Sequence, residues 1–241
     1  LDFRATDILN GTDATLSTTG HAYKLTKVSG SILQLSSVQV DNALGDIEVQ
    51  AGTLSFQGNM PSLGNPANTL TVFGGATLQF INVGSRMSKA LVLKDGAVVN
   101  NNAGANIYGS AVNLQGIALF NVAGSSLTFT NVLSGTGGLS KVTGAVPMIQ
   151  TASNTYSGNT LINAGTLTLA EPGDIRASQV ITLSSGGTLD VSGRADQTMT
   201  LLSGHSLAGR GTIIGNLAAP ANTTVAPRAD LGTVGTLFVN G

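Results

Sequence analysis

Residues 154–169 read NTYSGNTLINAGTLTL, and this stretch decides the fold. It contains two short runs in which apolar and polar residues alternate, and Gly165 separates the two runs. Alternation with a period of two is typical of a strand with one buried face, and a glycine lets the backbone turn sharply between strands. The stretch has no charged residue, no histidine and no cysteine, so it indicates strand structure and offers no catalytic or metal-binding side chains of these types.

The same phrase of strand, glycine corner and strand recurs along the chain. Its copies are IEVQAGTLSF at 47–56, LTVFGGATLQF at 70–80, LVLKDGAVVN at 91–100, LINAGTLTL at 161–169 and ITLSSGGTLDV at 181–191, with a reduced form, TLFVNG, at 236–241. Successive corner glycines, such as Gly165 and Gly187, lie about 22 residues apart. A period of this length indicates a solenoid in which each repeat forms one coil.

One coil of this length cannot bury its own apolar face. Stacking the next coil about 4.8 Å away pairs the backbones and covers each apolar column. The chain length then predicts about 11 coils and a rod on the order of 50 Å long. Residues 101–150 are less regular and predict a variable coil length. The first residues fit the period least, so we expect an N-terminal cap or arm at 1–28 and a β-solenoid domain at 29–241.

Composition supports this organisation and excludes several classes of function. Charged residues make up only 10% of the 241 residues, against roughly a quarter in an average globular protein. Ser, Thr and Asn therefore supply the surface polarity, and their ladders pair across coils without repulsion between like charges. A net charge of −1 gives no strong field for nucleic acid or anionic lipid. The absence of cysteine excludes disulfides and thiolate metal sites, and no run of about 18 apolar residues predicts a membrane span.

Residues 133–175 resemble the autotransporter-associated β-strand repeat, whose phrase runs G-x-G-x-L and then N-x-Y-x-G-x-T-x-I-x-x-G-x-L. The matching positions are Gly135, Gly137, Leu139, Asn154, Tyr156, Gly158, Thr160, Ile162, Gly165 and Leu167. Residues 205–241 are similar to the coils that close such arrays, while 30–132 match only as generic coils. Asn159 stands where the family commonly has glycine, and AVPMIQ at 145–150 replaces a Gly-Thr-Leu strand.

This resemblance implies an all-β fold, a right-handed parallel β-helix, in a bacterial protein located outside the cell or on its surface. It implies no catalytic residues, no cofactor-binding residues and no metal ligands, because the family is defined by its architecture. We therefore expect a protein that is not an enzyme and that has no cofactor.

The acidic and histidine residues offer the main alternative, an enzyme that cuts acidic polysaccharides. Such enzymes need clustered carboxylates and a basic partner. The densest acidic stretch holds Asp41, Asp46 and Glu48, with no basic residue nearby in the sequence, which favours a solvated face over a calcium site. His21 and His205 lie far apart in the chain and are predicted to occupy surface or turn positions, not to act as bases.

Two further patterns have a structural and a functional interpretation. SGTGGLSK at 134–141 has Ser140 where a phosphate loop needs its second glycine, so its glycines predict a tight corner. Five phenylalanines fall in the register of the inward-facing residues, which predicts an aromatic stack inside the solenoid in preference to an exposed sugar-binding strip. They are Phe56, Phe73, Phe80, Phe120 and Phe129.

Three functions follow from the predicted fold. The favoured one is a non-enzymatic structural subunit that stacks head-to-tail into a surface filament or layer, because the ends of a solenoid are open edges. Its N-terminal segment, 1–28, can then insert into a neighbour as an added strand. The alternative is a passenger or adhesin module that presents a binding surface to a host surface or a glycan. A polysaccharide-degrading enzyme is the least favoured. The expected partners are a second copy of the chain and a cell-surface or glycan partner, with no nucleic acid.

Overall fold

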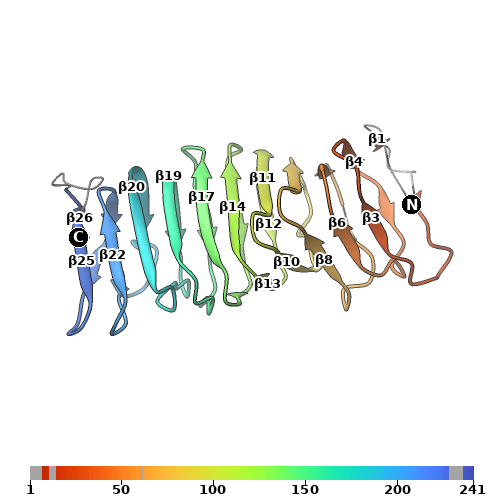
Figure 1. Ribbon diagram of the computed structural model, residues 1–241. Coiled ribbons are helices and arrows are strands. Elements are labelled where there is room, and N and C mark those ends of the chain that lie inside the picture. The colour runs from red at the N-terminus through yellow and green to blue at the C-terminus, as the bar shows by residue number, and fades with distance from the viewer. Residues whose placement is uncertain (1–6, 11–14, 61, 228–235) are drawn as a thin grey trace.

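The computed structural model describes residues 7–10, 15–60, 62–227 and 236–241, and all their regular elements are β-strands. These strands pair in parallel and stack as a β-solenoid of about 10 turns with about 21 residues in each coil. Figure 1 shows the coils following one another from the N-terminal to the C-terminal end of an elongated molecule. The all-β parallel solenoid predicted from the repeat is confirmed, with coils slightly shorter than expected. None of the described residues form a helix long and apolar enough to cross a membrane.

The strands form three faces around a shared core. The first face consists of β3 (Leu25–Lys27), β6 (Ile47–Val49), β8 (Thr69–Val72), β10 (Ala90–Leu93), β13 (Val112–Leu114) and β16 (Leu133–Ser134). The second consists of β1 (Asp7–Asn10), β4 (Ile32–Ser36), β7 (Thr53–Gln57), β9 (Thr77–Ile81), β11 (Val98–Ala103), β14 (Ile117–Val122), β17 (Gly138–Thr143), the first parts of β19 (Thr160–Leu169) and β20 (Val180–Asp190), β22 (Ser206–Gly209) and β25 (Thr224–Pro227).

The third face continues from the second around a corner. It consists of β12 (Ala105–Tyr108), β15 (Ser126–Phe129), β18 (Met148–Gln150), the second parts of β19 and β20, β23 (Thr212–Ile214) and β26 (Phe238–Asn240). Two short pairs stand apart from these faces, namely β2 (Thr15–Leu16) with β5 (Gln39–Val40), and β21 (Thr198–Thr200) with β24 (Asn216–Ala218). The long strands β19 and β20 each span two faces. Their register shifts at the corner between the two parts, between Ile162 and Ala164.

The core consists of columns of apolar side chains at equivalent positions of successive coils. On the second face, Leu33 pairs with Leu54 and Leu54 with Leu78, and the column continues through Val99 and Phe120. All five side chains are fully buried. Each one is covered by the coils above and below it, so every coil depends on its neighbours for its apolar burial.

Aromatic side chains fill the middle of this core. Four of the five phenylalanines predicted there are buried, namely Phe56, Phe80, Phe120 and Phe129. The prediction for Phe73 is wrong, because Phe73 follows the inward-facing Val72 and therefore lies half-buried at the corner after β8. Tyr108 is buried in the stack, with its ring centre 6.2 Å from that of Phe80 and 6.1 Å from that of Phe129.

Polar side chains form ladders on the outside of the second face. The Nε2 atom of Gln79 donates to Oγ of Ser55 at 3.2 Å, and Nδ2 of Asn100 donates to Oε1 of Gln79 at 3.0 Å. Further along, Oγ1 of Thr143 donates to Oδ1 of Asn121 at 3.0 Å. Neutral amides and hydroxyls thus pair from coil to coil, as the low charge of the sequence predicts.

The N-terminal strands continue the stack. Strands β1, β2 and β3 pair with β4, β5 and β6 of the next coil. The role of residues 1–28 as a cap or arm, and a domain boundary after residue 28, stay predictions.

Candidate functional site

The three acidic residues predicted to lie on one solvated face hold corners and strands together. Asp41 accepts hydrogen bonds from the backbone N–H of Ala43 at 2.9 Å, Thr18 at 3.0 Å and Gly20 at 3.2 Å, and from Oγ1 of Thr18 at 2.8 Å. These donors, the Ala43 N–H first among them, hold the pKa of Asp41 well below its usual range. Oδ2 of Asp41 fixes the loop at residues 18–20, and its Oδ1 holds the corner at Ala43.

Asp46 and Glu48 are also engaged by neighbouring coils. Asp46 accepts a hydrogen bond from the backbone N–H of Thr69 at 2.8 Å, which is the main cause of its lowered pKa. Glu48 lies 2.9 Å from the ammonium of Lys24, one coil earlier, and accepts a second bond from Nε2 of Gln50 at 2.8 Å. The fold therefore supplies the basic partner that the local sequence lacks. Within the described part of the chain, no three His, Asp or Glu side chains group so that they can hold a metal ion.

The residues that resemble the β-strand repeat form a buried polar clamp across three coils. Oδ1 of Asn154 accepts the backbone N–H of Leu133 at 2.8 Å, on the coil before it. Its Nδ2 donates to the backbone oxygen of Asp174 at 3.0 Å, on the coil after it, and to Oε1 of Gln150 at 2.7 Å. Asn154 is 4% exposed. The asparagine of the motif therefore joins coils.

The tyrosine and threonine of the motif extend this clamp. The hydroxyls of Tyr156 and Thr160 lie 2.7 Å apart, and Oγ1 of Thr160 donates to Oγ of Ser178 at 3.0 Å. Ser178 in turn donates to the backbone oxygen of Gly158 at 2.8 Å. Burial raises the pKa of the Tyr156 phenol, so it stays protonated. These motif residues carry structural hydrogen bonds.

Buried lysines are the feature that the sequence analysis missed. Lys27, Lys89 and Lys141 are all fully buried. The ammonium of Lys141 donates to the backbone oxygens of Thr143 at 3.2 Å and Gly144 at 2.8 Å, where β17 ends, and of Ala164 at 2.9 Å, on β19 of the next coil. Burial lowers the pKa of Lys141 to about 8. Alternation within GLSKVT, which makes Lys141 an inward residue like Leu139, is the signal that could have found it.

We expect the stability of the protein to rise with pH because of Lys141. Its pKa in the folded state, about 8, lies below the ordinary value of about 10.4, so the unfolded chain binds more protons between these values. The free energy of unfolding should therefore increase by about 1–2 kcal/mol between about pH 8 and pH 9.5 through this group. Urea unfolding at several pH values measures this change.

Lys141→Met is the variant that isolates this effect, because burial lowers the pKa of Lys27 and Lys89 as well. The pH dependence of its unfolding should be flatter than that of the parent protein. An equal slope in the two proteins would contradict the assignment to Lys141. The window stops near pH 9.5 because ionisation of the buried tyrosines in the unfolded chain opposes the trend above about pH 10.

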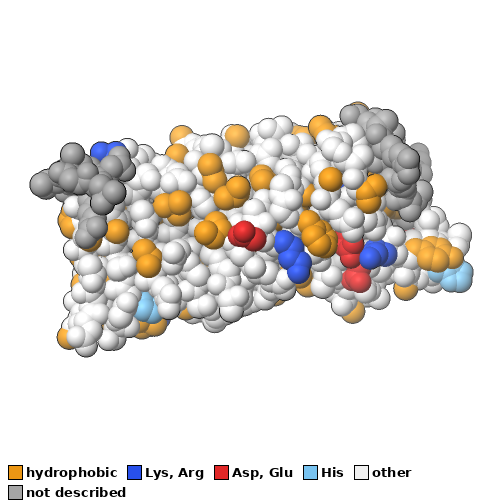
Figure 2. All heavy atoms as spheres, in the orientation of Figure 1, with side chains coloured by type: hydrophobic (Ala, Val, Ile, Leu, Met, Phe, Trp, Pro, Cys, Tyr) orange, Lys and Arg blue, Asp and Glu red, His pale blue; other side chains and the backbone are white. Residues whose placement is uncertain are grey.

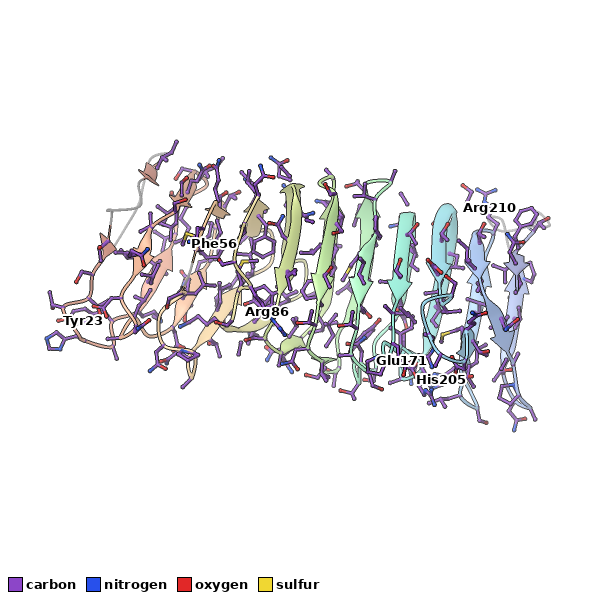
Figure 3. All side chains as sticks on the ribbon, turned by 180° about the vertical axis from the view of Figure 1, so that it is seen from behind. Tyr23, Phe56, Arg86, Glu171, His205 and Arg210 are labelled. Atoms are coloured by element: carbon purple, nitrogen blue, oxygen red, sulfur yellow. The ribbon has the colours of Figure 1, made fainter. Side chains whose placement is uncertain are left out.

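The two histidines lie apart in the structure. His21 is exposed in a turn, as predicted, beside Tyr23. His205 is half-buried, with Nδ1 3.0 Å from the backbone oxygen of Ser178. Figure 3 shows His205 and Tyr23 in distant parts of the molecule. The fold does not bring the two imidazoles into one site.

The glycine-rich segment at 134–141 forms a corner. Gly135 has a φ of +108°, a conformation that side chains with a Cβ rarely adopt. Ser140 is buried on β17. Backbone sterics therefore account for the glycines, in agreement with the predicted tight corner.

A shallow hollow of about 290 Å³ lies on the second face beside this corner. Its lining consists of Ile117, Leu119, Leu139, Ser140, Asn159, Thr160, Leu161 and Thr182. Ser140 stands between Leu119 and Leu161 in one outward column of paired residues. The hollow exists because a small side chain separates two large ones.

Comparison with known proteins gives one informative similarity. Residues of this chain are 30% identical, over 190 residues, to a segment of a protein named Adhesin BmaC autotransporter from Brucella suis biovar 1 (strain 1330). The match covers 77% of this chain and 5% of the adhesin, so the chain spans about one twentieth of that relative. This similarity and the solenoid fold fit an autotransporter passenger-like β-helix. No family model matches it, and no solved structure matches it significantly.

The similarity to an autotransporter agrees with the family resemblance of NTYSGNTLINAGTLTL. In the described chain, the candidate acids and the repeat motif take part in contacts within and between coils. Two surface features remain beside these contacts, the hollow at Ser140 and the exposed side chains of His21 and Tyr23.

Proposed function

We propose that this passenger-like β-helix is a rigid, non-enzymatic segment of a bacterial surface adhesin that carries binding loops away from the cell. The observation that carries this proposal is the similarity to an autotransporter adhesin over 77% of the chain. The stacked architecture supports it, because inward columns and buried clamps stiffen the rod while the corners are free to carry exposed loops.

Surface display tests this function. Bacteria that do not adhere to host cells would display the chain through a fused export system, and adherence to host cells and to immobilised glycans would be counted. We expect higher adherence than with cells that carry the export system alone. Unchanged adherence on both kinds of surface, with the rod intact by antibody accessibility, would reject the adhesin function. Cleavage of an acidic polysaccharide by the purified chain would reject the non-enzymatic part.

A head-to-tail filament is a second candidate, favoured by apolar side chains on the strands at the end of the stack. Val225 on β25 and Phe238 and Val239 on β26 are 39%, 56% and 44% exposed. Within the described residues each of these strands pairs on one side only, with β22 and β23, so a further strand, from the same polypeptide or from a second copy, can cover them. Negative-stain microscopy over a wide concentration range tests this: rods that lengthen support the filament, and uniform monomers reject it.

A further inference from the structure

An exposed aromatic pair stands out on a molecule whose aromatic residues are mostly buried. Tyr23 is 60% exposed, and Phe238 is the other aromatic side chain among the large exposed hydrophobic residues described. The imidazole of His21 lies beside the Tyr23 ring, with the ring centres 5.4 Å apart and the planes inclined by 34°. Figure 3 shows Tyr23 at the N-terminal end of the molecule, and Figure 2 shows a histidine beside a hydrophobic side chain protruding there.

The loop that carries the two rings is held in one conformation. The carboxylate of Asp41 binds the start of the loop through Thr18 and Gly20. The backbone oxygen of Tyr23 accepts the N–H of Gly45 at 2.9 Å, and the N–H of Tyr23 donates to the oxygen of His21 at 2.9 Å. The rings are therefore presented by a fixed backbone, which lowers the entropy cost of binding a ligand.

Polar groups able to bind hydroxyls follow the aromatic pair directly in the chain. Lys24 is the next residue, and its ammonium lies 2.9 Å from Glu48, whose carboxylate also accepts Nε2 of Gln50. The side chains of Lys24 and Glu48 are 50% and 22% exposed. A donor and an acceptor thus lie side by side in solvent, a pairing that matches a hydroxyl group, which both accepts and donates.

The size and charge of this surface decide which ligand it fits. Two rings offer far less area than the roughly 800 Å² that each partner buries in a stable protein interface. A sugar ring is of matching size, since its C–H face can pack on an aromatic ring while its hydroxyls reach polar neighbours. The one exposed ammonium here is already paired with Glu48, and Asp41 and Asp46 add negative charge, so the surface does not favour an anionic sugar.

We propose that His21 and Tyr23 form a binding platform for a neutral saccharide, with Lys24 and Glu48 as partners for its hydroxyls. The proposal rests on the adhesin function and names the chemical class of its partner. The sugar ring packs on the Tyr23 face, and the loop contacts at Asp41 and Gly45 keep that face in place.

Saturation-transfer NMR with the purified chain and neutral methyl hexosides at millimolar concentrations tests the platform. We expect saturation of the sugar ring protons, and at least about a fivefold weaker affinity in Tyr23→Ala. Glu48→Gln, which keeps the size of the side chain, should weaken binding less. Phe238→Ala is the matched control, because it removes an exposed aromatic ring at the other end and should leave binding unchanged.

The outcomes separate this site from the proposed function. No saturation transfer to any of the hexosides, or equal transfer with Tyr23→Ala, overturns the platform, while adherence by displaying bacteria would still stand. Saccharide binding that depends on Tyr23, in a chain that gives no adherence on any surface, overturns the adhesin function and supports the platform. Thermal unfolding of each variant verifies that the exposed substitutions leave the fold intact.

Discussion

Replacing Gly144 with alanine is expected to destabilise the protein by at least about 4 kcal/mol. Gly144 forms the corner between β17 and β18 with a φ of +85°. A Cβ at this position would overlap the backbone oxygen of Val122 on the preceding coil. Because that oxygen belongs to the backbone, relief requires the two coils to separate and not a change of rotamer. Urea unfolding combined with hydrogen exchange at the corner measures the loss.

Gly75→Ala is the matched control for this variant. Gly75 also occupies a corner, between β8 and β9, with a φ of +77°, but a Cβ there would meet no atom within 4 Å. Its substitution therefore costs only the left-handed backbone strain, about 1–2 kcal/mol. Equal losses in the two variants would show that the coils at Gly144 can relax, and the close stacking inferred at that corner would be wrong.

The contrast between these two glycines shows what the sequence can and cannot predict. Gly75 stands in the copy LTVFGGATLQF, so the period identifies it as a turn position, and Gly144 lies in the less regular part of the chain, 21 residues before Gly165. Only one of them lies against the backbone of the coil before it. Periodicity gives the fold and the corners, whereas the distance between coils at a given corner depends on three-dimensional stacking.

The contacts of charged residues show the same division. Lys24 and Glu48 form an ion pair between adjacent coils. Adding one repeat of about 22 residues to position 24 gives Asp46, so the period places Lys24 near acidic residues but does not identify Glu48 as its partner. Residue type alone predicts that Lys141 faces solvent, because charged side chains are rarely buried. Its ammonium stays buried because two neighbouring coils supply three backbone oxygens. Such an arrangement requires two coils and cannot be seen in a single repeat.

The candidate platform depends on local features that the repeat does not encode. Tyr23 and His21 lie in the least periodic part of the chain, so the pattern that predicts the rod predicts nothing about them. An exposed sugar-binding strip is the alternative interpretation of five phenylalanines, four of which are buried in the core. In a solenoid the inward residues follow the period, and binding surfaces are therefore expected where the period fails.

Asn154→Ala is expected to cost about 3–5 kcal/mol, because it leaves two buried polar groups without a partner. The backbone N–H of Leu133 loses its acceptor, and Oε1 of Gln150 loses its donor. The backbone oxygen of Asp174 keeps a bond from the N–H of residue 154. Hydrogen exchange should accelerate most at the Leu133 amide, and the urea midpoint should fall.

Two further variants test whether the cost comes from the contacts that Asn154 makes between coils, and not from the removal of an asparagine side chain in general. Asn100→Ala removes a half-buried outer asparagine that bonds Gln79, so it should cost less than about 1 kcal/mol. Gln150→Leu, between Phe129 and Leu169, should change stability little, because removing the buried Nε2 that has no partner offsets the loss of the bond that Oε1 accepts from Asn154.

Combining Asn154→Ala with Gln150→Leu should recover part of the loss, since the orphaned amide is then absent. If Asn154→Ala cost no more than Asn100→Ala, the asparagine of the repeat would not be the joint between coils. The repeat motif would then have to be explained by the strand pattern alone. If instead Asn154→Ala lowers the free energy of unfolding strongly and Gln150→Leu restores part of it, the side chain of Asn154 stabilises the contacts among three coils. This role would explain the asparagine of the repeat motif.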